Sequence, residues 1–304
     1  MTDAIATEQL TKVYRGKEAV SKLSMTVEQG QVFGFLGPNG AGKTTTIQML
    51  LGSISPTSGS ALLFGEKPGS RNVRKRIGYL PERFQFHDFL TAREFLVFHG
   101  KLAGMSRGQL AAAVPAVLGR VGLADRANDR LRSFSKGMQQ RAGLAQALIH
   151  DPDLIILDEP TSALDPLGRR DVRDIILELR SRGKTVLLNS HLLSEIEMTC
   201  DRVAIIKNGS VSVQGDVRDL LAFNSMVDIE VEQLNDAAMT AIRAIAAKIK
   251  FQDVPIRRFT AWVKREEDLP DLAAAIVQNG VRLSQFAPRR ETLEELFLRI
   301  VDPV

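Results

Sequence analysis

The chain has 304 residues, 44% of them hydrophobic and 25% charged, which is typical of a globular protein with about two domains. Lysine and arginine exceed aspartate and glutamate by only 40 to 36, so the charge does not indicate a nucleic-acid-binding block. The single cysteine excludes an intrachain disulfide, and the four scattered histidines do not suggest a metal cluster. With no apolar signal core and no run long enough to span a membrane, we expect a cytoplasmic protein that reaches any membrane through a partner.

Residues 5–30 alternate short apolar stretches with turn-like polar ones, which predicts an antiparallel hairpin. Tyr14 is the conspicuous residue of this region. Its ring either stacks on the flat base of a ligand or packs against strand neighbours, and its position alone favours neither interpretation.

The stretch 37–45, GPNGAGKTT, fits the phosphate-binding loop pattern G-x-x-x-x-G-K-[ST] at every fixed position. An apolar run of strand length precedes it at 31–36, and a helix-compatible run follows it at 46–51. Glycines let the backbone turn its N–H groups toward phosphate oxygens, and the positive end of the following helix points to the same place. The stretch, called the P-loop below, therefore predicts a nucleotide site.

Two P-loop side chains carry specific roles in this prediction. Lys43 adds a full charge for the β- and γ-phosphates of ATP, which also makes it a candidate catalytic residue. The Thr44 hydroxyl is placed to ligate the Mg²⁺ that accompanies ATP. The residues expected to bind the nucleotide are Gly37, Asn39, Gly40, Gly42, Lys43, Thr44 and Thr45.

A short strand predicted at 77–80 ends at Pro81, and Glu82 follows directly. Ligands of open α/β sheets bind at the carboxyl ends of strands, so Glu82 is a candidate to face the nucleotide. From about 83 to 133 helical runs replace strand-like ones, which predicts an α-helical insertion. Its five phenylalanines include Phe95 and Phe98 at helical spacing, which favours a core; the alternative is a partly exposed aromatic cleft that receives another protein.

The segment 134–141, FSKGMQQR, leads into a helix-compatible run, and Ser135 is a good N-cap for that helix. It is therefore a second helix N-terminus able to bind phosphate.

Two later strands end in polar residues suited to catalysis. The apolar run 154–157 ends in Asp158 and Glu159, where an aspartate can hold Mg²⁺ and the neighbouring glutamate can orient and deprotonate an attacking water. His191 stands just past a strand predicted at 185–188, which makes it a candidate to contact the γ-phosphate.

Taken in order, the P-loop, FSKGMQQR, LIILDEP, SALD and the following histidine resemble the ATPase subunits of ABC transporters, over about residues 4–220. The segment 134–141, called the signature segment below, is the most specific of these features. Many ATPases have a P-loop, whereas Ser-x-Gly before a helix, shortly upstream of an acidic strand end, is specific to this superfamily. The resemblance implies a general base at Glu159, a switch histidine at His191, an adenine-stacking aromatic at Tyr14, and ATP contacts from Ser135 and Gly137.

The sequence departs from the usual family pattern at two positions. Lys136 stands where the family usually has glycine, and Glu82 stands where it usually has glutamine. The segment with glutamate resembles the exporter branch often called ABC-2 type. Glu82 is therefore kept, with Thr44 and Asp158, as a candidate for the metal site.

After a polar linker at 215–225, the tail alternates apolar runs in the order β-α-β-β-α-β, which is ferredoxin-like. A capping box at 292–295 then opens a last amphipathic helix. The ending PRRETLEELFLRIV is similar to the C-terminal extension of drug and antibiotic exporter ATPases, which resembles a regulatory or dimer-supporting module; a passive appendage is the alternative. The runs are strand 227–231, helix 237–247, strands 251–256 and 259–264, helix 269–278 and strand 281–286.

We therefore expect an α/β fold: a P-loop NTPase of the ABC ATPase type at 1–220, with an antiparallel β subdomain and a helical subdomain at about 83–133. A small α+β ferredoxin-like domain at 226–304 follows it. With ATP and Mg²⁺ as cofactors, the resemblance implies an ATPase at the inner face of the cell membrane that powers export through a separate integral membrane permease. One P-loop and one signature segment per chain imply an ATP-dependent head-to-tail dimer with a second copy.

A soluble ABC-type ATPase that acts on nucleic acid or ribosomes is the second hypothesis. Proteins of that kind usually resemble two fused ATPase halves or carry long coiled coils, whereas this chain has one set of motifs and no heptad run. We therefore expect no nucleic-acid partner. A nucleotide-binding regulator without turnover is a third hypothesis, which the intact Glu159 and His191 argue against.

Overall fold

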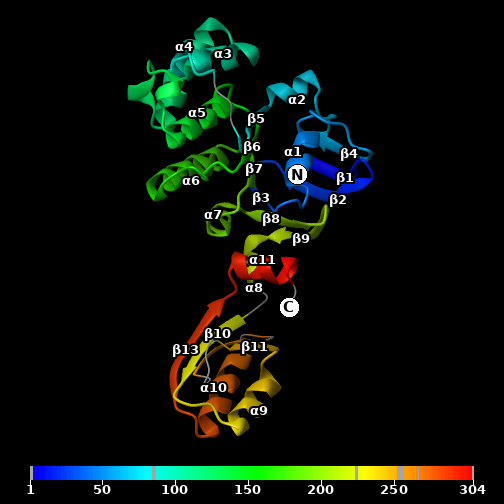
Figure 1. Ribbon diagram of the computed structural model, residues 1–304, viewed down its shortest axis with the longest axis vertical. Coiled ribbons are helices and arrows are strands. Elements are labelled where there is room, and N and C mark those ends of the chain that lie inside the picture. Colours follow the sequence, from blue (N-terminus) through cyan, green and yellow to red (C-terminus); the bar gives the residue numbers. More distant parts are fainter. Residues whose placement is uncertain are drawn as a thin grey trace. The chain divides into compact units, whose positions relative to one another are not determined.

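The computed structural model divides the chain into two compact units, Met1–Gly215 and Asp216–Val304 (Figure 1). No helix among the residues described is both long and apolar enough to cross a membrane. The structure describes residues 3–83, 87–222, 225–251, 257–263, 265 and 267–302.

The first unit begins with a three-stranded antiparallel sheet in the order β2-β1-β4. The predicted hairpin is confirmed as β1 (Asp3–Tyr14) paired antiparallel with β2 (Lys17–Glu28). The other neighbour of β1 is β4 (Ser58–Leu63).

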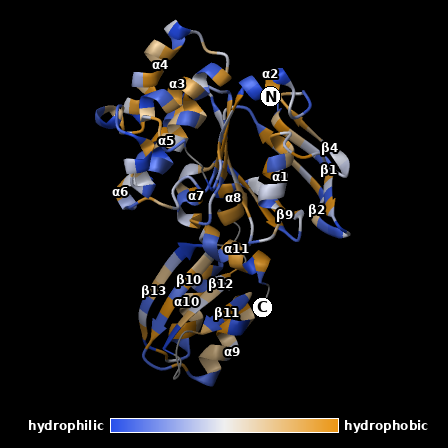
Figure 2. Cartoon of the chain, turned by 45° about the horizontal axis from the view of Figure 1, so that its top comes forward, coloured by the Kyte–Doolittle hydropathy of each residue, from blue (hydrophilic) through white to orange (hydrophobic). Residues whose placement is uncertain are grey.

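A six-stranded sheet in the order β5-β6-β7-β3-β8-β9 forms the centre of the first unit. Neighbours from β5 to β8 pair in parallel, and every residue of β3, β6 and β7 is buried, as expected of strands covered on both faces. Figure 2 shows apolar residues along these strands. The strands are β3 (Val32–Leu36), β5 (Ile77–Leu80), β6 (Leu154–Asp158), β7 (Thr185–Asn189), β8 (Arg202–Lys207) and β9 (Ser210–Asp216).

The predicted helical insertion lies between β5 and β6 and holds α3 (Ala92–Leu102), α4 (Arg107–Arg120) and α5 (Lys136–Leu148). Capping boxes begin α3 and α4. The hydroxyls of Thr91 and Ser106 each accept from the backbone N–H of the third helical residue, and their own backbone N–H groups donate to that residue's side chain. The remaining helices of this unit are α1 (Lys43–Leu50), α2 (Arg71–Lys75), α6 (Pro166–Ser181) and α7 (Leu193–Thr199).

The aromatic residues of the insertion divide between core and surface. Phe95 is buried, as the helical spacing predicts, but the same prediction is wrong for Phe98, whose side chain is 40% exposed. Phe98 meets the rings of His87 and His99 edge-on, at 5.5 and 5.3 Å between centroids. Phe89 is 70% exposed. Phe84 and Phe86 lie outside the described residues.

The second unit carries a four-stranded antiparallel sheet in the order β11-β12-β10-β13, which is the ferredoxin-like arrangement expected from the tail. Alternate residues of β10 point into a core shared with α9 and α10. The predicted strand 251–256 instead begins at Lys248, and its residues 252–256 lie outside the described residues, as does Lys264. The elements are α8 (Val217–Ala222), β10 (Ser225–Val231), α9 (Asp236–Ile245), β11 (Lys248–Phe251), β12 (Arg258–Val263), α10 (Asp268–Gln278), β13 (Leu283–Arg290) and α11 (Leu293–Val301).

An ion-pair network joins the start of α11 to the sheet. The Arg289 guanidinium donates to both carboxylate oxygens of Glu295, each at 2.8 Å, and to Asp228 at 2.7 Å. Glu295 also completes the predicted capping box, because its side chain accepts from the Thr292 backbone. The hydrogen bond from Arg289 has the largest effect on the pKa of Glu295. Together these bonds lower that pKa from 4.5 to about 2.

This network predicts a pH-dependent contribution to the stability of the second unit. A carboxylate with a depressed pKa stabilises the fold fully above its unfolded pKa and loses that effect as the pH falls toward the folded value. We expect Glu295→Gln, which keeps a capping side chain, to lower the free energy of unfolding above about pH 4.5 and to converge with the parent as the pH falls toward about 2.

Denaturant unfolding of the full chain, followed by Trp262 fluorescence, measures this effect, because the only tryptophan lies in β12 of the second unit. Glu294→Gln is the matched control: it removes the same charge from the same helix turn at an exposed position. Equal losses for the two variants at every pH would show that the helix terminus, not Arg289, accounts for the effect.

Candidate functional site

The P-loop connects β3 to α1, and its backbone conformation depends on glycine. Gly40 and Gly42 have φ of 79° and 101°, in the left-handed region. A Cβ at Gly37 would lie 2.5 Å from the carbonyl oxygen of Ile206, so no larger residue fits beside β8. The N-terminus of α1 has no side-chain cap, and an uncapped helix N-terminus is suited to bind an anion.

Lys43 is held by the P-loop itself. Its Nζ donates to the carbonyl oxygens of Gly37 at 2.5 Å and Pro38 at 3.1 Å. Burial lowers the pKa of Lys43, while the carboxylates of Glu159, Asp158 and Glu82 raise it. The predicted lysine and all three predicted acids therefore lie within electrostatic reach of one another.

Asp158 ends β6 opposite Asn189, which ends β7. The Asn189 amide donates to the Asp158 carboxylate at 2.5 Å, and the backbone N–H of Glu82 also hydrogen-bonds that carboxylate. Burial nevertheless raises the pKa of Asp158, since only 2% of the residue is exposed. Two neighbouring strand ends thus place a buried acid that a positive charge would stabilise.

Glu159 and His191 are in direct contact, with 2.6 Å between Oε2 and Nδ1. Burial raises the pKa of Glu159, and the neighbouring His191 opposes that rise. Glu159 has a φ of 56°, a left-handed backbone that costs a non-glycine residue about 1 to 2 kcal/mol. Such strain is found at functional positions that the surrounding structure holds in place.

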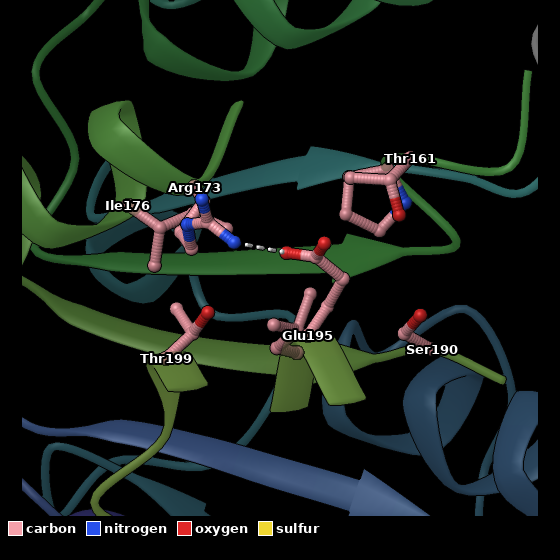
Figure 3. Close-up of a pocket in the computed structure, with 8 residues that line it drawn as sticks. Thr161, Arg173, Ile176, Ser190, Glu195 and Thr199 are labelled. Atoms are coloured by element: carbon pink, nitrogen blue, oxygen red, sulfur yellow. Dashed lines mark hydrogen bonds and ion pairs between the residues drawn. The ribbon is translucent and has the colours of Figure 1, made fainter. Parts of the chain in front are cut away.

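A cavity of about 10 Å³, which is room for one water molecule, is lined by residues of α6, α7 and the segments at the ends of β6 and β7 (Figure 3). Thr161 and Ser190 line it, and each lies within two residues of Glu159 or His191 along the chain. The Thr161 hydroxyl is buried without a hydrogen-bond partner. Glu195 of α7 and Arg173 of α6 form an ion pair at 3.3 Å across the same cavity.

The signature segment forms a separate site. Ser135 caps α5 by accepting from the Met138 N–H at 3.2 Å, as predicted. Together with Gly137, Arg141 and Asp165 it lines a cleft of about 580 Å³, and the residues found to line this cleft include none from the P-loop. Lys136 lines the same cleft.

Tyr14 lies at the end of β1 with its ring 44% exposed, and Lys12 Nζ is 5.1 Å from the ring centroid. Tyr14 therefore lies outside the sheet core, and the Lys12 ammonium lies over its ring.

Sequence reasoning missed two residues of this site. Asn189 ends a buried strand just as Asp158 does, so the rule applied to the acid would have found it. Gln140 lies within the signature segment, and its side chain reaches the Glu159 carbonyl oxygen at 3.1 Å. The position of Gln140 along the sequence does not predict that contact.

The residues present fit MgATP. Within the described ranges, no group of three or more histidine, cysteine, aspartate or glutamate side chains could hold a metal ion. Mg²⁺ takes one or two protein carboxylates and completes its ligands with substrate phosphates and water. The Asp158 carboxylate and the exposed Thr44 hydroxyl offer the hard oxygens it requires, and the glycine-lined P-loop suits the phosphates.

Comparison with known proteins gives consistent matches. The sequence family described as ABC transporter matches residues 20–162. An uncharacterized ABC transporter ATP-binding protein of Synechocystis is 38% identical, over 98% of this chain and 84% of the relative. The bacitracin transport ATP-binding protein of Bacillus licheniformis is 36% identical, over 99% and 98%. The Nod factor export ATP-binding protein I of Cupriavidus metallidurans is 35% identical, over 99% and 98%.

Solved structures match about 70% of the chain. The ATP-binding subunit of an ABC transporter superposes with a TM-score of 0.67 and 29% identity, over 71% of this chain and 91% of its own. A dimeric ATP-binding cassette with ADP and Pi bound superposes with a TM-score of 0.64 and 25% identity, over 70% of this chain and 99% of its own.

Proposed function

The chain belongs to the ABC transporter family of ATP-binding proteins, which hydrolyse ATP, and we propose that this hydrolysis drives export through a separate membrane permease. The observation that carries the proposal is the contact of Glu159 with His191 at the strand ends that also place Asp158 beside the P-loop. Similarity over nearly the full length to proteins named for bacitracin transport and Nod factor export supports the direction of transport.

We assign the following roles. The P-loop and Lys43 hold the phosphates, since the glycine N–H groups and the Lys43 ammonium belong to the same loop. Glu159 is the general base, because burial raises its pKa toward the working pH. His191 orients Glu159 and contacts the γ-phosphate. Tyr14 stacks on the adenine.

The metal site in this proposal consists of Thr44, Asp158 and Glu82. Bound there, Mg²⁺ neutralises phosphate charge. Asp158 suits this role because it is buried with an excess of negative charge around it. Glu82 contributes at longer range, as its carboxylate raises the pKa of Lys43, Asp158 and Glu159.

A second copy of the chain completes the nucleotide site in this proposal. Ser135 and Gly137 line a cleft apart from the P-loop, so ATP held by one copy is free to meet the signature segment of another. The similarity to a dimeric ATP-binding cassette supports this arrangement. The working protein is then a head-to-tail dimer, held at the inner face of the membrane by its permease, with no nucleic-acid partner. We propose the second unit as a separate C-terminal domain from about residue 226.

The permease partner is tested by purifying the tagged chain from membranes with detergent and identifying the bound proteins. We expect an integral membrane protein in stoichiometric amount, and recovery of ribosomal proteins or nucleic acid in its place would contradict the proposal. The exposed apolar residues of the helical insertion are the candidate contact. Phe89→Ser should therefore reduce the recovered permease, while Val277→Ser, which changes an exposed residue of the second unit, should not.

Glu82 is tested by the Mg²⁺ dependence of hydrolysis. A carboxylate attracts the metal and repels the phosphates, so attraction prevails with Mg²⁺ bound and repulsion prevails without it. We expect Glu82→Gln to raise the Mg²⁺ concentration for half-maximal hydrolysis and to bind metal-free ATP more tightly than the parent. Glu8→Gln, at an exposed position on β1, is the control. Superimposable curves for Glu82→Gln and the parent would remove Glu82 from the metal site.

A further inference from the structure

The backbone of Glu159 makes four hydrogen bonds, two of them from Ser162, whose N–H (3.4 Å) and hydroxyl both donate to the Glu159 carbonyl oxygen. The Glu159 N–H donates to the carbonyl oxygen of Asn189 at 2.9 Å. Its carbonyl oxygen accepts from the Ser162 hydroxyl and from the Gln140 side-chain amide, each at 3.1 Å. Because Glu159 has the left-handed φ of 56°, these bonds hold a conformation that the residue would otherwise leave.

Among the residues that make these bonds, Gln140 is the one that belongs to α5. It lies five positions after the Ser135 cap, and only 9% of it is exposed. A buried amide without a partner is costly, so its Nε2 is committed to the bond with the Glu159 carbonyl oxygen. The bond spans 19 residues of sequence and joins two elements that carry different parts of the nucleotide site.

We propose that Gln140 is a positioning residue: its amide fixes the Glu159 peptide, and through it the carboxylate, relative to the N-terminus of α5. The inference rests on the proposed function, in which Ser135 and Gly137 contact the ATP held by a second copy. In that arrangement, ATP bound at the N-terminus of α5 fixes the position of this helix. The Gln140 amide then sets the position of Glu159 in the same chain. Hydrolysis in one site is thereby tied to occupancy of the other.

A purely structural Gln140 is the competing explanation, since a buried residue of a core helix also supports folding. The two explanations differ in which quantity changes. A packing defect lowers thermal stability and ATP affinity together, whereas a misplaced Glu159 lowers the rate of the chemical step and leaves binding intact. A positioning residue also has no effect once the group it positions can no longer act.

The test is a set of variants assayed for ATP hydrolysis, ATP affinity and melting temperature. Gln140→Met keeps the length and shape of the side chain and removes the donor. Gln146→Met is the matched control at a half-buried position later in α5, outside the signature segment. We expect Gln140→Met to lower kcat about tenfold or more, with KM and ATP affinity within about twofold of the parent. In the Glu159→Gln background, adding Gln140→Met should leave the residual rate unchanged.

An unchanged kcat in Gln140→Met, or the same fold loss in the parent and Glu159→Gln backgrounds, would overturn the proposal. If Gln140→Met does not fold, Ser162→Ala decides, because it removes the other side-chain donor to the same carbonyl from an exposed position. Ser162→Ala should lower kcat and leave KM unchanged. A kcat equal to that of the parent would overturn the inference. A parent that binds ATP without hydrolysing it would instead overturn the proposed function.

Discussion

Three carboxylates converge on a single ammonium at the carboxyl end of the central sheet. Asp158, Glu159 and Glu82 all raise the pKa of Lys43, and burial raises the pKa of Asp158 and Glu159. A triphosphate would be repelled by such a site unless cations and N–H groups outweigh the acids. The glycine-dependent P-loop and the uncapped α1 terminus supply N–H groups for that balance, and the proposed Mg²⁺ would add positive charge.

Sheet topology brings these groups together. The parallel order β6-β7-β3 sets the ends of three strands side by side, and each end continues into a loop that carries part of the site. Asp158 and Asn189 are register partners, so their hydrogen bond follows from the pairing of β6 with β7. The same edge holds Glu159 against His191. Strand ends position Asp158, Glu159 and His191, while Ser135 and Gly137 of the signature segment line a cleft whose lining residues include none from the P-loop.

Much of this could be predicted from local sequence, because the P-loop and the acidic strand end obey short-range rules of glycine conformation and strand burial. What could not be predicted depends on long-range packing. The strand β8 has no distinctive sequence, yet its Ile206 sets how closely Gly37 approaches. Phe98 has the same helical spacing as a core residue but faces outward beside His87. The contact of Gln140 with Glu159 requires two elements to dock before either residue has a partner.

Glu159 is the proposed base, needed for turnover but not for binding, in a site that a second chain would complete. Size-exclusion chromatography of Glu159→Gln with MgATP tests both parts at once. Without hydrolysis to end it, the ATP-bound dimer should accumulate, while the parent returns to the monomer as it consumes the nucleotide. A Glu159→Gln variant that elutes only as a monomer at saturating MgATP would contradict the composite site.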